Sequence, residues 1–133
     1  MGVILVVDDS ALVREMLSGE LRRWGFTVET AVDGVDAKVK IAANPPILVV
    51  TDLIMPQMNG YELCRWVKNN PTTLNVPVIM CSTKGEEFDR YWGMKQGADA
   101  YITKPYQAKD MINAVKYLLE EAGSYQEDSM GSS

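Results

Sequence analysis

The sequence contains no histidine among its 133 residues. This absence excludes histidine general bases, histidine metal ligands and phosphohistidine chemistry within the chain itself. Cysteine is scarce as well, since only Cys64 and Cys81 occur, without the CxxC spacing of a redox or zinc motif. We interpret both thiols as small buried side chains of a protein in a reducing compartment. Carboxylates, hydroxyls and amines must carry whatever chemistry the chain performs.

Neither a surplus of basic residues nor a long hydrophobic run is present. The chain has 13 Lys and Arg residues against 18 Asp and Glu residues, and its formal charge of −5 argues against a nucleic-acid partner. The first apolar run, Val3–Val7, is too short for a signal peptide or a membrane span. The length suits one globular domain. We expect a cytoplasmic protein without a membrane or nucleic-acid partner.

Short apolar segments alternate with segments of helical periodicity along the chain. The five strand-length segments are residues 3–7, 28–32, 47–51, 76–82 and 100–103. Between them apolar residues recur at helical spacing, as Leu12, Met16 and Leu21 do. The first three helical segments begin at N-cap residues, namely Ser10, Asp33 and Asn59. Continuous apolar strands that alternate with helices predict an α/β fold around a parallel sheet buried on both faces.

Two segments need a separate interpretation. Phe88, Tyr91 and Trp92 lie in the fourth helical segment, where at most two of them can face the sheet. We therefore expect one of them, Trp92, to be exposed toward a partner. The residues after Gly123 are small and polar. This composition predicts a domain over residues 1–123 followed by a flexible polar tail over residues 124–133.

Polar side chains follow four of the strands at the point where each ends. They are Asp8 and Asp9 after the first, Asp52 after the third, Ser82 and Thr83 at the fourth, and Lys104 after the fifth. In an open parallel sheet these ends share one edge, where ligands collect. Three carboxylates at one edge repel each other unless a cation neutralises them, and oxygen ligands favour Mg²⁺. Helix capping would account for Asp9 and Ser10 but not for Asp52 or Lys104.

The chain resembles response regulator receiver domains, the CheY-like family, in four elements and over residues 3–122. These are Asp8-Asp9, the segment DLIMPQMNG at residues 52–60, Ser82, and Lys104-Pro105. The resemblance implies a flavodoxin-like, doubly wound sheet of five parallel strands in the order 2-1-3-4-5 with five helices. It also implies a stand-alone switch of a two-component phosphorelay. Such a switch catalyses only its own phosphorylation and dephosphorylation and is not an enzyme toward other substrates.

The resemblance assigns roles to the residues at the strand ends. Asp52 would accept a phosphoryl group from the phosphohistidine of a partner histidine kinase. Asp9, Asp52 and the backbone carbonyl of Ile54 would ligate Mg²⁺, and Asp8 would act mostly through a bound water. Lys104 would supply the remaining positive charge that the phosphoryl oxygens require. By the same resemblance the Lys104-Pro105 bond is expected to be cis.

A switch from the phosphorylation site to a partner surface is implied in the same way. Ser82, in preference to Thr83, would hydrogen-bond the phosphoryl group and draw its loop inward. Tyr101 would be the aromatic residue whose inward or outward position follows activation. A downstream target protein would then bind the surface of the fourth helix, fifth strand and fifth helix, where Trp92, Tyr101 and Tyr106 are the expected contacts.

Two further residues bear on how long the phosphoryl group persists. Ile54 and Lys84 lie two residues beyond Asp52 and Ser82, at positions where side chains overhang the phosphoryl site in this family. Neither carries an amide or a carboxylate that could orient hydrolytic water. We therefore expect slow intrinsic dephosphorylation.

Residues 92–98, with the sequence WGMKQGA, are similar to regulators of type IV pilus and phototaxis systems. This similarity suggests a target in the motility machinery, for chemotaxis or twitching motility. Separately, we expect the protein to be a monomer or a weak dimer. A magnesium-dependent aspartyl phosphohydrolase of the haloacid dehalogenase type is an alternative. It would need a DxD pair, whereas Leu53 and Ile54 follow Asp52.

Two non-enzymatic alternatives use the same fold. A flavodoxin-like ligand-binding module would need hydroxyls and glycines around a bound phosphate, where this chain has Asp8 and Asp9. A receiver fold that serves purely as a scaffold is disfavoured, because no residue required for phosphorylation is missing.

Overall fold

The computed structural model describes residues 2–123, in which strands and helices alternate. The strands are β1 (Val3–Val7), β2 (Thr27–Ala31), β3 (Leu48–Asp52), β4 (Val78–Ser82) and β5 (Ala100–Thr103). The helices are α1 (Ala11–Arg23), α2 (Gly34–Ala43), α3 (Gly60–Asn69), α4 (Glu87–Lys95) and α5 (Ala108–Glu121). All strand pairs are parallel and the order is β2-β1-β3-β4-β5. The predicted fold class and strand order are confirmed, whereas the predicted tail at 124–133 lies outside the described residues.

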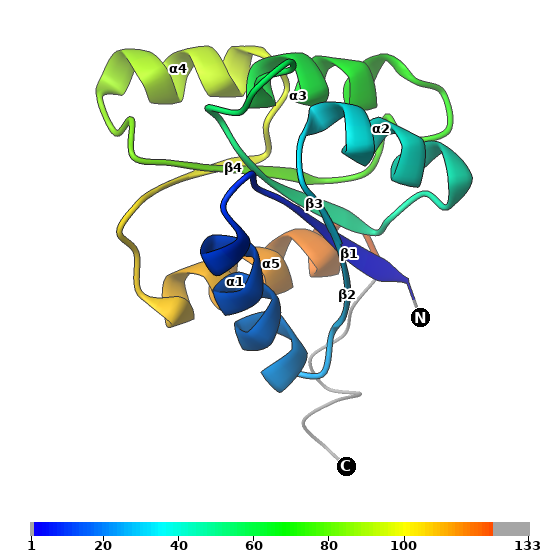
Figure 1. Cartoon of the computed structure of the whole chain (residues 1–133), viewed down its shortest axis with the longest axis vertical. Coiled ribbons are helices and arrows are strands. Elements are labelled where there is room, and N and C mark those ends of the chain that lie inside the picture. The colour runs from blue at the N-terminus through cyan, green and yellow to red at the C-terminus, as the bar shows by residue number, and fades with distance from the viewer. Residues whose placement is uncertain (1, 124–133) are drawn as a thin grey trace.

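Helices cover both faces of the sheet (Figure 1). Helices α2, α3 and α4 lie on one face, and α1 and α5 lie on the other. Leu5 and Val7 point into the core beneath α2 and α3, whereas Ile4 and Val6 point into the core beneath α1 and α5. Because successive side chains of a strand point to opposite faces, a strand buried on both sides is apolar at every position. No helix in residues 2–123 is long and apolar enough to cross a membrane.

Three strands have boundaries that differ slightly from those predicted. Strand β2 begins and ends one residue earlier, β3 extends through Asp52, and β4 begins at Val78 instead of residue 76. Pro77 explains the later start of β4, because proline has no N–H to donate to a neighbouring strand. Its carbonyl still accepts a hydrogen bond from the Val49 N–H at 3.0 Å. Asp52 pairs with Cys81 of β4, so its backbone is held within the sheet.

Three helices begin at the predicted N-caps. The side chain of Ser10 accepts a hydrogen bond from the Val13 N–H at 3.3 Å, and Asp33 accepts one from the Asp36 N–H at 2.7 Å. Asn59 forms a capping box with Glu62, in which each side chain accepts from the backbone N–H of the other residue. The caps at Ser10 and Asn59 fix the starts of α1 and α3, and with them the ends of the loops that follow β1 and β3.

Helix α4 presents its aromatic residues to solvent, and this corrects the prediction for that segment. Phe88, Tyr91 and Trp92 are 71%, 57% and 43% exposed, so Trp92 is exposed as predicted but none of the three lies in the core. The buried residue of α4 is Gly93. A Cβ atom on Gly93 would lie 2.9 Å from Cδ2 of Tyr101. The helix therefore contacts the sheet through a glycine and leaves its large apolar side chains outside.

Candidate functional site

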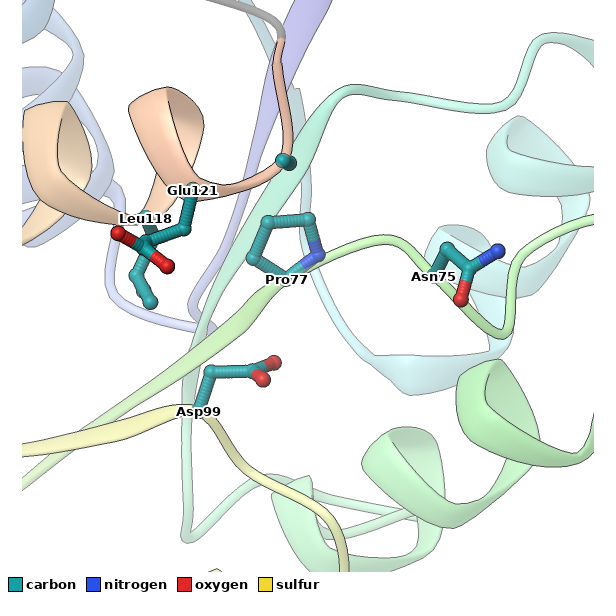
Figure 2. A pocket seen from close by; sticks show the side chains of 6 residues that line it. Asn75, Pro77, Asp99, Leu118 and Glu121 are labelled. Carbon is teal, nitrogen blue, oxygen red and sulfur yellow. The ribbon is translucent and has the colours of Figure 1, made fainter.

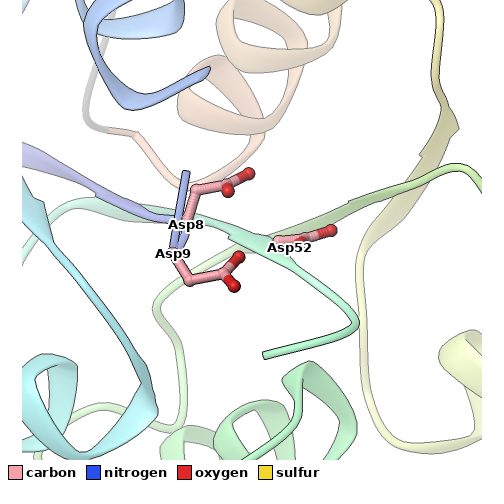
Figure 3. A group of neighbouring side chains, drawn as sticks. All are labelled: Asp8, Asp9 and Asp52. Atoms are coloured by element: carbon pink, nitrogen blue, oxygen red, sulfur yellow. The ribbon is translucent and has the colours of Figure 1, made fainter. Parts of the chain in front are cut away.

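Asp8, Asp9 and Asp52 meet at the carboxyl edge of the central strands (Figure 3). One carboxylate oxygen from each residue lies within 4.8 Å of the other two. Strands β1 and β3 are neighbours, so the residues that follow β1 lie beside the last residue of β3. Asp8 is buried, Asp9 is exposed and Asp52 is intermediate. A set of carboxylate oxygens with one solvent-facing member fits a hard divalent cation such as Mg²⁺, which retains several waters when bound.

Lys104 places an ammonium group between two of these carboxylates. Its Nζ lies 3.1 Å from Oδ2 of Asp8 and 3.4 Å from Oδ1 of Asp52. Its backbone N–H donates to the carbonyl of Ser82 at 2.7 Å, which holds it beside the end of β4. The Lys104-Pro105 peptide bond is cis, as predicted. The predicted site lysine therefore lies with the carboxylates although 52 residues separate it from Asp52.

The charges of Lys104, Asp52 and Asp8 act on one another. Burial opposes the charged form of Lys104, but Asp52 and Asp8 outweigh it, so the pKa of Lys104 lies above its ordinary value. Burial also raises the pKa of Asp52, a shift that Lys104 opposes and Asp8 reinforces. The three carboxylates lie close together, and one ammonium pairs with two of them, Asp8 and Asp52. The group has an excess of negative charge that a divalent cation would neutralise.

Asp8 is anchored by the loop that follows β1. Its Oδ1 accepts a hydrogen bond from the Ser10 N–H at 2.9 Å, while its other oxygen faces Lys104. Its backbone carbonyl accepts a hydrogen bond from Nη1 of Arg14 at 2.7 Å. Arg14 was not among the predicted site residues. Its position in the first turn of α1 is the sequence signal that could have indicated a contact with the Asp8 loop. Arg14 ties the start of α1 to the carboxylate loop.

The loop after Asp52 is closed by a glycine. Oδ1 of Asp52 accepts a hydrogen bond from the Leu53 N–H at 2.9 Å, and the Gly60 N–H donates to the Leu53 carbonyl at 2.8 Å. A Cβ atom on Gly60 would lie 2.5 Å from the backbone oxygen of Asp52, so a larger residue would displace this backbone. The side chain of Ile54 projects from the loop and is exposed. A role for its carbonyl in metal binding stays a prediction.

The side chains of Ser82 and Tyr101 both form hydrogen bonds with the backbone of Lys84. Ser82 is buried at the end of β4, and its Oγ accepts a hydrogen bond from the Lys84 N–H at 3.1 Å, whereas Thr83 is exposed. The hydroxyl of Tyr101 donates a hydrogen bond to the Lys84 carbonyl. The guanidinium of Arg90 lies 5.6 Å from the centre of the Tyr101 ring. The segment between β4 and α4 is thus tied to both predicted switch residues.

The predicted partner surface is only partly exposed in this conformation. Tyr101 is 6% exposed and lies beneath Gly93, so its ring is not available to a partner here. Tyr106 is of intermediate exposure, and Trp92 is the most accessible of the three predicted contacts. Contact through Tyr101 would require the ring to move outward. That movement stays a prediction.

Both cysteines are free and buried, which confirms the interpretation of their packing. Burial raises the pKa of Cys64 to about 11 and that of Cys81 to about 12. Thiols with raised pKa values are poor nucleophiles at neutral pH. They therefore contribute to the core and not to the chemistry of the site.

A separate hollow lies at the opposite edge of the sheet, where β4 and β5 begin (Figure 2). Its lining comprises Asn75, Pro77, Asp99, Leu118, Glu121 and Ala122. Asp99 is already paired, because its Oδ2 lies 2.8 Å from Nζ of Lys68 and accepts a hydrogen bond from the Val78 N–H at 2.8 Å. The hollow contains none of the residues that meet at the carboxyl edge. It is therefore not part of the candidate site.

Comparison with known proteins places the chain in a family. The family model of the response regulator receiver domain matches residues 4–116. Protein PilG of Pseudomonas aeruginosa is 39% identical over 113 residues, a match that covers 85% of this chain and 84% of PilG. The phosphate regulon transcriptional regulatory protein PhoB of the same species is 36% identical over 120 residues, which are 90% of this chain and 52% of PhoB. The chain thus spans about half the length of several longer regulators.

Solved structures agree with this placement. Chemotaxis protein CheY4 of Vibrio cholerae has a TM-score of 0.84 at 29% identity, with 90% of this chain and 99% of that chain covered. A CheY-like receiver domain protein of Methanospirillum hungatei has a TM-score of 0.86 at 27% identity, with 92% and 97% covered. The chain belongs to the response regulator receiver domain family. The likeness to PilG supports the predicted similarity to type IV pilus regulators.

Proposed function

We propose that this receiver domain accepts a phosphoryl group on Asp52 from a histidine kinase and thereby switches a protein-binding surface. The observation that carries the proposal is the ammonium of Lys104, which lies between Asp8 and Asp52 at the edge where three carboxylates meet. A carboxylate nucleophile beside a fixed positive charge suits phosphoryl transfer, which depends mainly on positioning and charge neutralisation. The chain has no histidine, so the phosphohistidine belongs to a partner.

In the transfer, a carboxylate oxygen of Asp52 forms a bond to phosphorus while the phosphorus–nitrogen bond of the partner's phosphohistidine breaks. The imidazole leaves with the bonding electron pair. Lys104 offsets negative charge on the phosphoryl oxygens. Asp8, Asp9, Asp52 and the carbonyl of Ile54 would hold Mg²⁺, which when bound supplies further positive charge next to these oxygens. Asp8 is anchored by Ser10 and Lys104, whereas Asp9 is exposed and free to reorient toward a cation.

The switch follows from the contacts of Ser82. In this conformation its oxygen accepts from the Lys84 N–H, and the Lys84 carbonyl holds the hydroxyl of Tyr101. A phosphoryl group on Asp52 offers strong acceptor oxygens to the Ser82 hydroxyl. If Ser82 turns toward them, it would draw the backbone of Lys84 inward, and the position of Tyr101, whose hydroxyl is bound to the Lys84 carbonyl, would change with it. The exposed face of α4, with Trp92, would then bind a downstream protein, with the motility machinery as the proposed target.

The lifetime of the phosphorylated form should be long. The side chains of Ile54 and Lys84 are both exposed, and neither carries an amide or a carboxylate that could orient a hydrolytic water. Decay of radiolabelled phospho-Asp52 should take minutes or longer in the absence of a phosphatase. A half-life of seconds would contradict this expectation.

Labelling by a small phosphodonor tests the central proposal. Acetyl phosphate with Mg²⁺ should phosphorylate the wild-type chain, as measured by intact-mass spectrometry, and chelation of Mg²⁺ should prevent the reaction. Asp52→Ala should abolish labelling, whereas Asp110→Ala, which removes an exposed carboxylate on α5, should leave it unchanged. Equal labelling of wild type and Asp52→Ala would refute the proposal. Steady release of phosphate from other phosphate esters would favour a phosphohydrolase instead.

A further inference from the structure

The side chain of Arg14 reaches back from the first turn of α1 to the loop that follows β1. Its Nη1 donates a hydrogen bond to the carbonyl of Asp8 at 2.7 Å. This carbonyl belongs to the peptide group that joins Asp8 to Asp9. Hydrogen bonds from a charged donor are stronger than those between neutral groups. The contact therefore restrains the plane of the peptide that connects two of the three carboxylate residues.

The two aspartates on either side of this peptide are held very differently. The carboxylate of Asp8 is buried, and it contacts the Ser10 N–H at 2.9 Å and the Lys104 ammonium at 3.1 Å. The Asp8 N–H also donates to the Ala31 carbonyl at 3.2 Å. The carboxylate of Asp9 is exposed, and within residues 2–123 it has neither a hydrogen-bond nor a salt-bridge partner. The backbone therefore sets the position from which Asp9 reaches a cation.

Arg14 is a firm support for this peptide because its own backbone is fixed. Its N–H donates to the Ser10 carbonyl at 3.0 Å, and the Ser10 hydroxyl caps the same turn by accepting from the Val13 N–H. The Arg14 side chain is half-buried. A guanidinium has no lone pair to offer a metal, and its positive charge opposes the binding of a cation nearby. Any gain in metal affinity from Arg14 must therefore come from orientation.

We propose that Arg14 is a positioning residue of the metal site, which holds the Asp8–Asp9 peptide so that Asp9 is directed toward the cation. The inference rests on the metal role proposed above for Asp8, Asp9 and Asp52, and it adds a residue that does not itself ligate. Hydrogen bonds that orient metal ligands contribute to affinity, and their loss typically weakens metal binding by about 10- to 100-fold. Because Arg14 orients one ligand of the set, we expect the lower end of this range.

Titration of the isotope-labelled, full 133-residue chain with Mg²⁺ alone, followed by NMR, tests this inference. Arg14→Met keeps an unbranched stem and removes both the charge and the donor. The variant should bind Mg²⁺ about tenfold more weakly than wild type. Charge alone predicts the opposite sign, because removal of a nearby cation tightens Mg²⁺ binding. Equal or tighter binding by Arg14→Met would overturn the inference.

Two further variants separate positioning from helix stability. Arg22→Met is the matched control, since Nη2 of Arg22 donates to the Val28 carbonyl at 3.1 Å near the other end of α1. It should leave Mg²⁺ affinity unchanged, and an equal loss in this control would contradict the assignment to Arg14. Arg14→Lys keeps the charge and a donor, so it should bind Mg²⁺ more tightly than Arg14→Met. Weaker binding by Arg14→Lys would show that charge outweighs orientation and would overturn the inference.

Labelling by acetyl phosphate at increasing Mg²⁺ concentration distinguishes metal binding from the transfer step. In Arg14→Met the Mg²⁺ concentration for half-maximal labelling should rise about tenfold, while the rate at saturating Mg²⁺ stays near that of wild type. A lower saturating rate with an unchanged half-maximal concentration would overturn the inference. Mg²⁺ binding by wild type without labelling of Asp52 would refute the proposed phosphorylation and leave this inference standing. Absence of Mg²⁺ binding by wild type would overturn it.

Discussion

Gly93 lies so close to Tyr101 that a Cβ atom on the glycine would approach Cδ2 of the ring to 2.9 Å and the sulfur of Met80 to 3.2 Å. The absence of a side chain at residue 93 is what lets α4 rest on the tyrosine. The large apolar side chains of α4 face outward. The contact between Gly93 and Tyr101 therefore determines how closely the helix approaches the sheet.

Gly93→Ala should therefore destabilise the protein or drive Tyr101 out of its position. Overpacking of this kind typically costs about 1–3 kcal/mol of the free energy of unfolding. Gly19→Ala is a matched control, because a Cβ atom there meets nothing within 4 Å in the interior of α1. It should stabilise the protein by about 0.5–1 kcal/mol through helix propensity. Urea unfolding of both variants measures the two changes, and changes of the same sign would contradict this account.

Asp52→Asn tests the electrostatics of the acidic group, Asp8, Asp9 and Asp52, in the metal-free protein. Burial raises the pKa of Asp52, which means that the folded chain binds a proton at this carboxyl more readily than the unfolded chain does. Ionisation of Asp52 therefore lowers stability as the pH rises through the interval between the unfolded and folded pKa values. The variant should melt above wild type at neutral pH, and the difference should shrink as the pH falls through the raised pKa. A difference that grows in acid would contradict this sign.

Asp9→Ala should raise the melting temperature of the metal-free protein, because it removes a like charge within 4.8 Å of Asp8 and Asp52. The same variant should lose most of the stabilisation that Mg²⁺ gives to wild type. Thermal melts with EDTA and with Mg²⁺ provide both measurements, and Glu15→Gln on the exposed face of α1 serves as the control. A lower melting temperature of Asp9→Ala in EDTA would count against carboxylate crowding.

Trp92 offers an optical reading of the switch, because it is partly exposed on α4. Beryllofluoride with Mg²⁺, which mimics a phosphoryl group on Asp52, should change the tryptophan emission of wild type. Trp92→Phe should lack the change, which would exclude Trp24 and Trp66 as its source. Ser82→Ala should also lack it while acetyl phosphate still labels Asp52. A full emission change in Ser82→Ala would remove Ser82 from the switch.

The sequence allowed the sheet and the acidic group to be predicted because their signals are local. Each buried strand is an apolar run, and Asp8, Asp9 and Asp52 follow two such runs directly. The position of Lys104 was predictable as well, since parallel strands bring their carboxyl ends to one edge. Chain order thus sufficed to bring these four residues together.

The exposed face of α4 could not be predicted in the same way. Helical spacing shows which aromatic residues share a face but not which face turns inward. Here a glycine occupies the inward position, and a glycine gives no hydrophobic signal. The contact of Arg14 with the Asp8 carbonyl was missed for a similar reason, because a long side chain can reach many backbone groups. Both features depend on tertiary packing.

The hydrogen bond from the Gly60 N–H to the Leu53 carbonyl ties together the two ends of the loop that follows Asp52. A loop clamped at its base resists deformation, and the capping box at Asn59 stiffens the far side further. The segment of Lys84, in contrast, is held by single hydrogen bonds to two side chains. A displacement at Asp52 would therefore be resisted by the loop before α3 and accommodated more easily by the Lys84 segment before α4. If Asp52 is phosphorylated as proposed, this asymmetry would direct the resulting displacement toward α4 before any partner binds.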